Sequence, residues 1–579
     1  MIYQNTYGSK LYPVREIKTL KEMLDTGATL FKDKPAFLAK AKKGGIYQEL
    51  THRQLKTDVD ALGTKLIEMG LLGEKIAIIG DNSYQWITSY FAVVNGVGIV
   101  VPLDKELSPA EIYNLIETVS CKAVFYTSNF ESIFKEYDIP FKFKMEVYSE
   151  KDAPESEISW RYLVNEGRKL LSAGDTRFIE AEINPNEMKI MLFTSGTMDI
   201  PKAVMLSHGN VISNVISTSQ IVHLKEDERT LSVLPIHHTF ESTMGIMTVL
   251  FQGCSIAFYE GLKYVTKNLE EAKASALVGV PLIFESIYDK IWKQAEKTKK
   301  AGALRAAINL NKTLKVTLGV DASRKLFKSV YASFGGRLRL LITGAAAIDP
   351  KVLRGFQDLG FEVAQGYGLT EAAPLVTGTP DFTNRYKKAG SCGPVIPGGE
   401  LQIVDQDEEG IGEIIYRGPN VMLGYYNMPE LTAEVIRDGW FYTGDLGFVD
   451  ENGWLYITGR KKNIVVTKTG KNIFPEEIER QLMKIPYIAE CMVYGLQSSD
   501  KKANNDDTIV AVKIQPNYER IYEEFGENFG ENQIYALLKK HVMETNQGFP
   551  NYKWVHHIAI QSGDFVKTTT KKIKRHENM

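Results

Sequence analysis

The sequence MLFTSGTMDIPKAVMLSHGN, residues 191–210, joins an apolar strand pattern to a turn rich in hydroxyl groups. The apolar residues 190–193 lead into residues 194–197, and Lys202 follows. A Walker phosphate loop would carry a second glycine directly before its lysine, where this chain has Pro201. Hydroxyl groups, a glycine that lets the backbone approach closely and a mobile cation still suit a polyphosphate. Ser207 is the expected cap of a helix that begins at His208. On its own, however, residues 194–197 predict only a turn after a strand.

The chain contains strand patterns that alternate with helix patterns. Residues 74–80 are typical of a buried strand, and Asp81 or Asn82 is the expected cap of the helix that follows. The most apolar stretch, residues 86–103, contains glycines and is at the short limit for a membrane span. We therefore interpret it as a buried helix followed by a strand.

The same alternation returns at residues 338–368. A strand pattern ending at Gly344 is followed by Asp349 and Pro350, which suit the N-cap and the first position of a helix. Strands alternating with helices predict an α/β protein whose parallel sheets are covered on both faces. Ligands in such folds lie at the carboxyl ends of the strands. The segments expected to face one crevice are therefore 194–203, 344–347 and 365–371.

The domain organisation follows from the chain length and from changes in the residue pattern along the chain. At 579 residues the chain is too long for one ordinary core. Short alternating strands separated by Gly, Asp and Asn turns predict a β-rich subdomain at about residues 395–458. A compact α+β pattern follows. We expect a large N-terminal domain over residues 1–460 and a small α+β C-terminal domain over residues 461–579.

Composition excludes several classes of protein. Hydrophobic residues make up 44% and charged residues 24%, which is an ordinary soluble balance, and the net charge of −2 gives no reason to expect nucleic acid as a partner. The N-terminus has early charges and no apolar region of a signal peptide. The cysteines lie far apart without a C-x-x-C pair, which argues against a disulfide framework or a zinc site and predicts a cytoplasmic protein. They are Cys121, Cys254, Cys392 and Cys491.

A basic helical stretch at residues 285–340 has two interpretations. Its lysines all lie within residues 285–330. One interpretation is a solvated helical face. The other is peripheral contact with an anionic surface at the inner face of a membrane. No segment predicts the oligomeric state.

Three later motifs suit a nucleotide. Tyr367 lies between glycines, where its ring could stack on a base, and Thr370 and Glu371 offer a hydroxyl and a hard carboxylate for a phosphate and its Mg2+. Asp445 lies in a turn and could accept both hydroxyls of a ribose, although an Asx turn that caps itself is the alternative. The lysine-rich end VKTTTKKIKR, residues 566–575, is either functional or a frayed basic tail.

Taken in order, these segments resemble the adenylate-forming (AMP-binding) superfamily, most closely its acyl-CoA synthetases of the long-chain fatty acid type. The resemblance covers roughly residues 20–575. Residues 194–203 resemble the family loop T-S-G-T-T-G-x-P-K-G, and LPIHHTFE at residues 234–241 resembles L-P-x-x-H-x-F-E. The other matching segments are GAAA at 344–347, QGYGLTE at 365–371, TGD at 443–445 and GRKKNIVVTKTGKNIFPEEIE at 459–479.

The resemblance implies an ATP-dependent ligase. Such an enzyme activates a fatty acid as acyl-AMP with release of pyrophosphate, and then transfers the acyl group to coenzyme A to give acyl-CoA and AMP. It uses Mg2+, and its small C-terminal domain is mobile and rotates between the two steps. The loop after residue 193 would then hold the phosphates of ATP while pyrophosphate leaves.

The resemblance also assigns residues to roles. Lys572, Glu371, Thr194 and Lys202 would be catalytic, and Glu371 would hold the metal. His238 and Glu241 would belong to the acyl pocket, Lys462 would be the hinge, and Gly470 and Lys471 would line the coenzyme A path. The residues expected to bind ATP or AMP are Thr194, Ser195, Gly196, Thr197, Lys202, Gly344, Ala345, Ala346, Gln365, Gly366, Tyr367, Gly368, Thr370, Asp445 and Arg460.

Departures from the family pattern keep alternatives open. Met198, Asp199 and Ala203 differ from the family loop, and a carboxylate among phosphates is repulsive unless it points away or binds the metal. Near the C-terminus, Val566 and Lys571 replace the proline and the glycine of P-K-T-x-x-G-K-I-x-R, so Lys567 is the rival of Lys572.

Two other functions remain as alternatives. One is acyl-adenylate formation with transfer to a carrier-protein thiol or another acceptor. By the family resemblance, the absence of an insertion after the hinge, between Arg460 and Gly470, favours transfer to coenzyme A over transfer to another acceptor. The other is a non-catalytic lipid-binding or scaffold protein that retains the fold.

Overall fold

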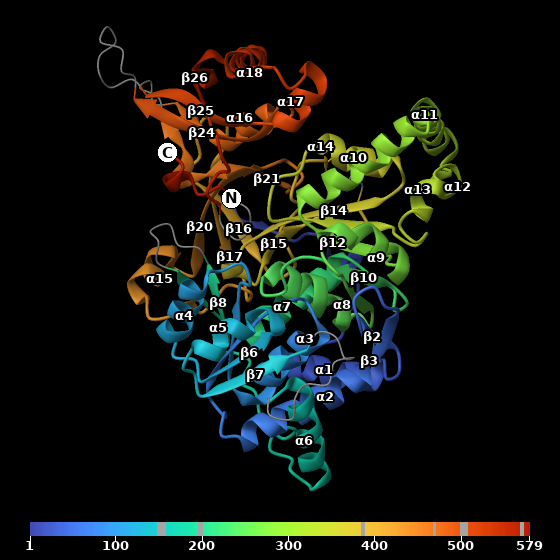
Figure 1. Ribbon diagram of the computed structural model, residues 1–579, viewed down its shortest axis with the longest axis vertical. Helices are drawn as coiled ribbons and strands as arrows, with labels where there is room; N and C mark the ends of the chain where they lie inside the picture. The colour runs from blue at the N-terminus through green and yellow to red at the C-terminus, as the bar shows by residue number, and fades with distance from the viewer. Residues whose placement is uncertain (147–157, 195–200, 384–387, 467–470, 498–507, 568–572) are drawn as a thin grey trace.

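The structure is a computed structural model that describes residues 1–146, 158–194, 201–383, 388–466, 471–497, 508–567 and 573–579. Its N-terminal part contains two large sheets, each mainly parallel (Figure 1). The seven-stranded sheet has the order β18-β9-β8-β5-β4-β6-β7. Its strands are β4 (Lys75–Ile79), β5 (Ile99–Leu103), β6 (Ala123–Thr127), β7 (Phe141–Met145), β8 (Met188–Thr194), β9 (Lys202–Ser207) and β18 (Gly424–Tyr425).

The second large sheet has eight strands in the order β15-β14-β13-β12-β10-β11-β2-β3. Only its two outer pairs, β14 with β15 and β2 with β3, are antiparallel. The strands are β2 (Pro35–Lys40), β3 (Tyr47–Thr51), β10 (Arg229–Ser232), β11 (Ser255–Phe258), β12 (Ala276–Gly279), β13 (Leu340–Thr343), β14 (Glu362–Gly368) and β15 (Leu375–Gly378). Parallel strands buried on both faces explain the long apolar runs in the sequence.

The main core contains side chains from both sheets and from the helices α2 (His52–Glu68), α3 (Tyr84–Ala92) and α7 (His208–Ile221). Trp86 and Phe91 of α3 are fully buried there. The π-helical segment Val93–Val97 and strand β5 complete the apolar stretch 86–103. This stretch is therefore a buried helix followed by a strand, as predicted. Within the described part of the chain, no helix combines the length and apolarity that a membrane span requires.

Local capping signals explain where several helices begin. Ser207 caps α7 and accepts a hydrogen bond from the N–H of Asn210, and Asp349 caps α14 (Pro350–Asp358), both as predicted. The expected cap of α3 was wrong, because Ser83 accepts the hydrogen bond from Trp86. Asn82 instead donates to Ser232 Oγ and to the carbonyl of Leu234, and so ties this turn to the other large sheet.

Residues beyond 400 form an antiparallel sheet that also takes in the N-terminal strand β1 (Tyr3–Gln4). Its remaining strands are β16 (Glu400–Val404), β17 (Gly412–Arg417), β19 (Ile436–Arg437), β20 (Trp440–Val449) and β21 (Leu455–Arg460). The pairing of β1 with β16 links the two ends of the predicted N-terminal domain, a contact that sequence patterns do not indicate. The strands β16 to β21 lie within or close to the region predicted to be β-rich, whose bounds as a subdomain stay a prediction.

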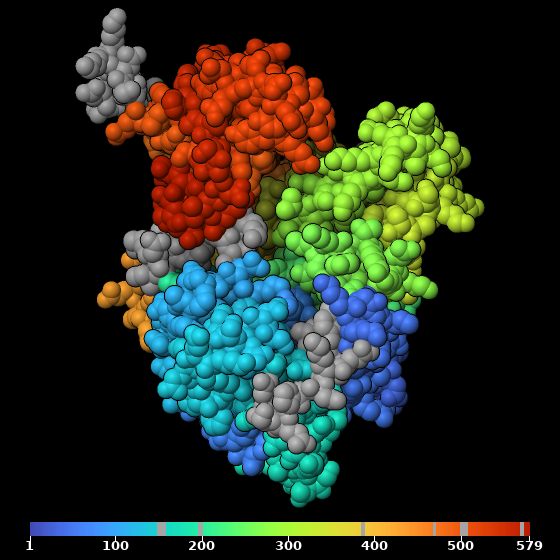
Figure 2. Space-filling model, viewed as in Figure 1, coloured from blue at the N-terminus to red at the C-terminus, as the bar shows by residue number. Residues whose placement is uncertain are grey.

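The C-terminal part has a core of its own around a three-stranded sheet. The strands are β24 (Ile488–Gln497), β25 (Thr508–Pro516) and β26 (Val555–Ile560), and the helices are α16 (Pro475–Leu482), α17 (Tyr518–Phe525) and α18 (Glu531–Asn546). This part lies at one end of the molecule, above the large sheets in the views of Figures 1 and 2. The overall class is the predicted α/β fold with a small α+β unit. The boundary at residues 460–462 and the mobility of that unit stay predictions.

Candidate active site

A large cleft of about 3100 Å³ lies where the carboxyl ends of strands from both large sheets meet. Strands β5, β8, β13 and β14 all end at its wall, and residues of β20 and β21 line it from the antiparallel sheet. The carboxyl ends of parallel strands leave polar loops at one edge, which is where ligands bind in α/β folds. Within the described residues, each of the three segments predicted to face one crevice contributes to its wall: 344–347 and 365–371 do so in full, and the first segment does so through Thr194, Pro201 and Lys202.

Most predicted site residues line this cleft, and a few do not. Glu241 is 1% exposed and is absent from the lining, and Lys471 lies elsewhere, with its ammonium 4.5 Å from the ring centroid of Tyr552. Ser195, Gly196, Thr197, Asp199, Gly470 and Lys572 lie outside the described residues. The cleft brings together Thr194, Lys202, His238, Gly344, Ala345, Ala346, Gln365, Gly366, Tyr367, Gly368, Thr370, Glu371, Asp445, Arg460 and Lys462.

The segment QGYGLTE folds back on itself after β14. A Cβ atom on Gly368 would lie 2.1 Å from the carbonyl oxygen of Pro374, so only glycine fits this close approach. The chain then turns through the short helix Thr370–Ala372 and returns as β15. This fold presents the side chains of Thr370 and Glu371 to the cleft.

Two buried asparagines hold the loop that carries Glu371. The amide group of Asn420 donates to the carbonyls of Ala372 and Leu375, at 2.6 and 2.9 Å. Asn214 of α7 donates to the same carbonyl of Leu375 at 2.9 Å and accepts from its N–H at 3.2 Å. The N–H of Met422 in turn donates to the carbonyl of Glu371. Backbone groups of this loop are thus satisfied by side chains from two distant segments.

Glu371 has a partner that sequence patterns did not indicate. The hydroxyl of Tyr425, a residue only 5% exposed, donates to Oε1 of Glu371 at 2.9 Å. The ammonium of Lys202 lies 5.2 Å from the centroid of the same ring, within the range of a cation–π contact. Tyr425 is brought there because β18 pairs with β9, opposite Val204. One side chain therefore contacts both the predicted metal ligand and the predicted phosphate-binding lysine.

Asp445 lies at the junction of the antiparallel sheet with β14. Its Oδ2 accepts a hydrogen bond from the hydroxyl of Tyr367 at 2.7 Å, and Nε of Arg460 lies 2.8 Å from its Oδ1. Burial and then the charge of Asp445 raise the pKa of Tyr367 well above its usual value. The same carboxylate raises the pKa of Arg460. Each carboxylate oxygen can accept more than one hydrogen bond, so Asp445 retains acceptor capacity for ribose hydroxyls.

Positive charge gathers around Lys462 at the cleft. Lys462 remains exposed at the wall, but the surrounding protein partly desolvates its ammonium and lowers its pKa. The charges of Arg460 and Lys202 lower that pKa further, whereas Asp445 raises it, and Arg575 from the C-terminal part adds to the repulsion. Such a group of cations is stabilised by a polyphosphate. The sequence indicated Lys462 only as a hinge and gave no role to Arg575.

The predicted rival lysines near the C-terminus are not equivalent. Lys567 lines the cleft, but its ammonium lies 2.6 Å from a carboxylate oxygen of Glu490. Lys567 also forms a β-bridge with Ile573, the first described residue after Lys572. A lysine already paired with a carboxylate is less suited to stabilise a phosphate, so this contact favours Lys572 as the functional residue, which stays a prediction.

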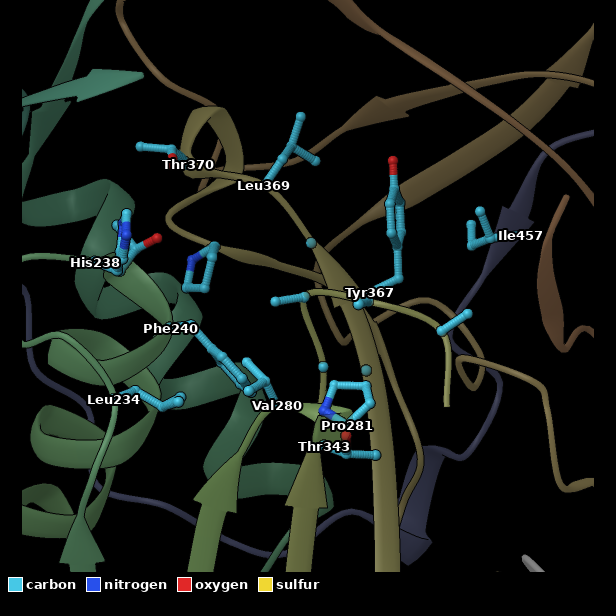
Figure 3. Close-up of a pocket in the computed structure, with 18 of the residues that line it drawn as sticks. Leu234, His238, Phe240, Val280, Pro281, Thr343, Tyr367, Leu369, Thr370 and Ile457 are labelled. Atoms are coloured by element: carbon cyan, nitrogen blue, oxygen red, sulfur yellow. The ribbon is translucent and has the colours of Figure 1, made fainter. Parts of the chain in front are cut away.

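Another part of the cleft wall is apolar. Figure 3 shows Leu234, Phe240 and Val280 on one side of this pocket and Tyr367 and Ile457 on the other. Beneath the wall, burial raises the pKa of Glu241 to about 8, although the Ser232 hydroxyl and the Leu234 amide act against this rise. Glu241 is thus mainly protonated at neutral pH, and it supports the wall rather than lining it.

An α/β fold with an open cleft, a cationic end and an apolar end defines a protein that binds a phosphorylated ligand beside an apolar one. Residues 24–426 match the model of the AMP-binding enzyme family, so the chain belongs to that family. The peroxisomal long chain acyl-CoA synthetase 6 of Arabidopsis thaliana is 29% identical over 506 residues, which cover 82% of this chain and 69% of that protein.

Two solved structures show the same fold. The anthranilate CoA ligase AuaEII in complex with anthranoyl-AMP has a TM-score of 0.74 at 18% identity and covers 98% of this chain and 97% of its own. The O-succinylbenzoate coenzyme A synthetase MenE of Bacillus subtilis, in complex with ATP and magnesium ion, has a TM-score of 0.70 at 19% identity, with 96% and 98% covered.

The cation group generates a prediction about nucleotide binding. Replacing Lys462 with Gln removes one of the charges that converge on the cleft, and should weaken ATP binding about fivefold, or ~1 kcal/mol. Lys461→Gln is the matched control, because the ammonium of Lys461 lies 2.6 Å from Glu413 instead. Calorimetric titration with ATP gives both dissociation constants. Equal effects of the two substitutions would remove Lys462 from the phosphate site.

Proposed function

We propose that this chain is an ATP-dependent, AMP-forming acyl-CoA ligase that acts on long-chain fatty acids. The observation that carries the proposal is that one cleft is lined by Glu371, by Asp445 and the cations around Lys462, and by a set of apolar side chains. Membership of the AMP-binding enzyme family supports the adenylation step. The long-chain relative from Arabidopsis thaliana supports the fatty acid and coenzyme A as co-substrates.

The chemistry proceeds in two displacements. A carboxylate oxygen of the acid attacks the α-phosphorus of ATP, the bond to the bridging oxygen breaks, and pyrophosphate leaves with its electron pair. The thiolate of coenzyme A then attacks the acyl carbon of the mixed anhydride, and AMP leaves. Both steps pass through states with extra negative charge, which positioned cations stabilise. Lys202 and Arg460 line the cleft for this purpose, and Lys572 is the predicted cation at the α-phosphate.

The residues around Glu371 fit a magnesium ion. Mg2+ prefers hard oxygen donors, and Glu371 and its neighbour in sequence Thr370 both line the cleft. The hydrogen bond from Tyr425 occupies Oε1 and orients the carboxylate. When bound, the ion would neutralise charge on the phosphates of ATP. Glu371 would hold it, and Lys202 would contact the phosphates from the facing strand.

The apolar end of the cleft supports an acyl chain as the second ligand. A charged or strongly polar acid would lose its hydration against this wall without gaining partners. A long alkyl chain instead gains about 0.8 kcal/mol for each methylene that leaves water. The apolar residues of the lining include Leu234, Phe240, Met244, Val249, Val278, Val280, Leu282, Ile283, Ile342 and Ile348.

A panel of carboxylic acids from acetate to oleate tests the proposed function. We expect AMP formation that depends on both coenzyme A and the acid, and we expect kcat/KM to rise with chain length. Pyrophosphate release without acyl-CoA formation would indicate another acceptor, such as a carrier-protein thiol. If no acid of the panel released pyrophosphate, the chain would be a binding or scaffold protein and the proposal would be wrong.

Tyr425 provides a second test, directed at the metal. Tyr425→Phe removes the hydrogen bond to Glu371 but keeps the ring beside Lys202. A lost hydrogen bond of about 1 kcal/mol should raise the Mg2+ concentration for half-maximal pyrophosphate exchange several-fold. Tyr426→Phe is the control, because its ring lies near Lys75. An unchanged Mg2+ requirement in Tyr425→Phe would show that this phenol does not orient the metal ligand.

We also propose that the basic helices contact an anionic membrane surface. α10 (Pro281–Lys297) and α11 (Ala301–Leu318) extend from the body of the molecule, as Figures 1 and 2 show. At the end of α11, Val316 and Leu318 are 86% and 68% exposed. Apolar side chains that insert between headgroups, beside lysines that attract them, are typical of peripheral binding. The exposed basic residues are Lys290, Lys293, Lys297, Lys299, Lys300, Arg305, Lys312, Arg324, Lys325 and Lys328.

Vesicle sedimentation tests this contact. The chain should bind vesicles that contain phosphatidylserine, and bind phosphatidylcholine vesicles much less. Leu318→Glu should weaken binding at least several-fold, because it places a charge among the anionic headgroups. Ile46→Glu is the control, since Ile46 is 89% exposed on the loop between β2 and β3. If both substitutions act alike, or if phosphatidylserine has no effect, α11 is not the docking surface.

A further inference from the structure

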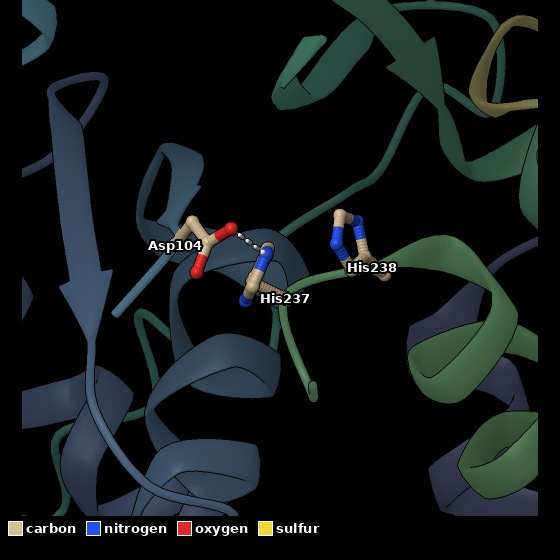
Figure 4. A group of neighbouring side chains, drawn as sticks. All are labelled: Asp104, His237 and His238. Carbon is tan, nitrogen blue, oxygen red and sulfur yellow. Dashed lines mark ion pairs between the residues drawn. The ribbon is translucent and has the colours of Figure 1, made fainter. Parts of the chain in front are cut away.

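Asp104, His237 and His238 form a cluster at the cleft wall that the proposed reaction does not use as a unit. Their side chains lie together in Figure 4, with His237 between the other two. Asp104 follows β5 of the seven-stranded sheet, and the histidines follow β10 of the eight-stranded sheet. The cluster therefore joins the carboxyl ends of strands from both large sheets. All three residues line the cleft, which gives the cluster access to solvent and to ions.

The ligand atoms of this cluster converge. Each residue offers one ligand atom, and these atoms all lie within 4.8 Å of one another. Nε2 of His237 is 3.3 Å from Oδ2 of Asp104, and the two imidazole centroids are 4.1 Å apart. In a tetrahedral site with bonds of about 2.0–2.1 Å, ligand atoms are about 3.3–3.4 Å apart. One pair already has this separation, and the ligand atom of His238 lies within 4.8 Å of both of its atoms.

The carboxylate and the first imidazole are held in position. Oδ1 of Asp104 accepts the backbone N–H of Glu106, and its Oδ2 is the oxygen nearer to His237. His237 is 8% exposed, and across the described residues its Nε2 makes no hydrogen bond of standard geometry despite the short distance to Asp104. A hydrogen bond would align an N–H with the oxygen. An imidazole nitrogen and a carboxylate oxygen at this separation could instead both bind one cation.

The surrounding charges favour a cation. The neighbouring Lys105 lies 2.5 Å from the carboxylate of Asp81, so its charge is compensated by that ion pair. The carboxyl group of Glu111 also lies near enough to sense the charge of Asp104 and that of Lys574. Among all described residues, this is the one group of three or more histidine, cysteine or acidic side chains with ligand atoms this close.

We propose that Asp104, His237 and His238 bind a divalent transition-metal ion, such as Zn2+, at the wall of the cleft. Two imidazoles and one carboxylate are a donor set for zinc and its neighbours in the first transition row, whereas Mg2+ takes oxygen donors. Three protein ligands leave a fourth position for water from the cleft. A bound ion would link the His237–His238 segment to the end of β5, and would hold the imidazole of His238 at the acyl end of the cleft.

Zn2+ titration of the full-length protein after chelator treatment tests the site, in buffer without nucleotide and with Mg2+ present. We expect one Zn2+ per chain, and Co2+ should give visible absorption bands of a four-coordinate ion. His237→Ala and Asp104→Asn should each lower the affinity at least about tenfold. His557→Ala is the matched control, because His556 and His557 form another adjacent pair, exposed on β26.

The outcomes separate the proposal from its rivals. Loss of Zn2+ in His237→Ala and in Asp104→Asn, with an unchanged thermal transition in at least one of them, supports the site. Absence of Zn2+ binding, binding that His237→Ala leaves unchanged, or binding that His557→Ala removes would each overturn it. Displacement of Zn2+ by millimolar Mg2+ would overturn it as well, because it would place the ion at Glu371.

A second readout rests on the proposed function. Because a bound ion would fix His238 beside the acyl chain, stoichiometric Zn2+ should inhibit pyrophosphate release in the wild type at saturating Mg2+ and ATP. His237→Ala should require at least tenfold more Zn2+ for the same inhibition. The titration does not depend on activity. If the protein binds Zn2+ but has no ligase activity, the metal site stands and the proposed function fails.

Discussion

The arrangement of the cleft depends on two buried side-chain amides. Asn214 and Asn420 are 0% and 1% exposed, and both donate to the carbonyl of Leu375. A buried carbonyl without a partner would cost several kcal/mol, so the turn after β14 can be buried only while these amides are present. Asn214 belongs to α7, the helix that follows the loop predicted to bind phosphates. Asn420 lies between β17 and β18. The loop of Glu371 is therefore fixed by the same bonds that hold three distant segments together.

This constraint explains why the site residues come from so many elements. Parallel strands joined by helices point the same way, so β13 and β14 of the eight-stranded sheet end together at the cleft, and β8 of the seven-stranded sheet ends at the same cleft. The antiparallel sheet adds Asp445 and Arg460 to its wall. The seven-stranded sheet contributes Lys202 through β9, whose outer neighbour β18 delivers Tyr425. Lys202 and Tyr425 are far apart in the sequence, and they meet because β18 pairs with β9 in this sheet.

The parts that the sequence predicted are those with local causes. Ser207 and Asp349 act as caps because a hydroxyl or carboxylate can accept from an N–H two or three residues ahead, and Gly368 is needed because the backbone turns on itself there. Most of the residues predicted to bind the nucleotide could be found in the sequence from such local signals together with the family resemblance. Tyr425, Asn420 and Arg575 could not, because a tyrosine in GYY or an asparagine after proline carries no periodic signal for a partner 45 or more residues away. Glu241 was expected in the acyl pocket from its motif, yet the π-helical turn Phe240–Met247 directs it into the core.

The charges at the cleft give the predicted hinge a physical reason. Lys462 feels the repulsion of Arg460 and Lys202 and, from the C-terminal part, of Arg575. In the proposed reaction a bound polyphosphate would compensate these charges and so link the two parts of the chain. Departure of pyrophosphate would remove most of that negative charge and restore the repulsion between the cations. That repulsion would favour the predicted movement of the C-terminal part, and Lys462 lies where the chain passes from β21 to that part.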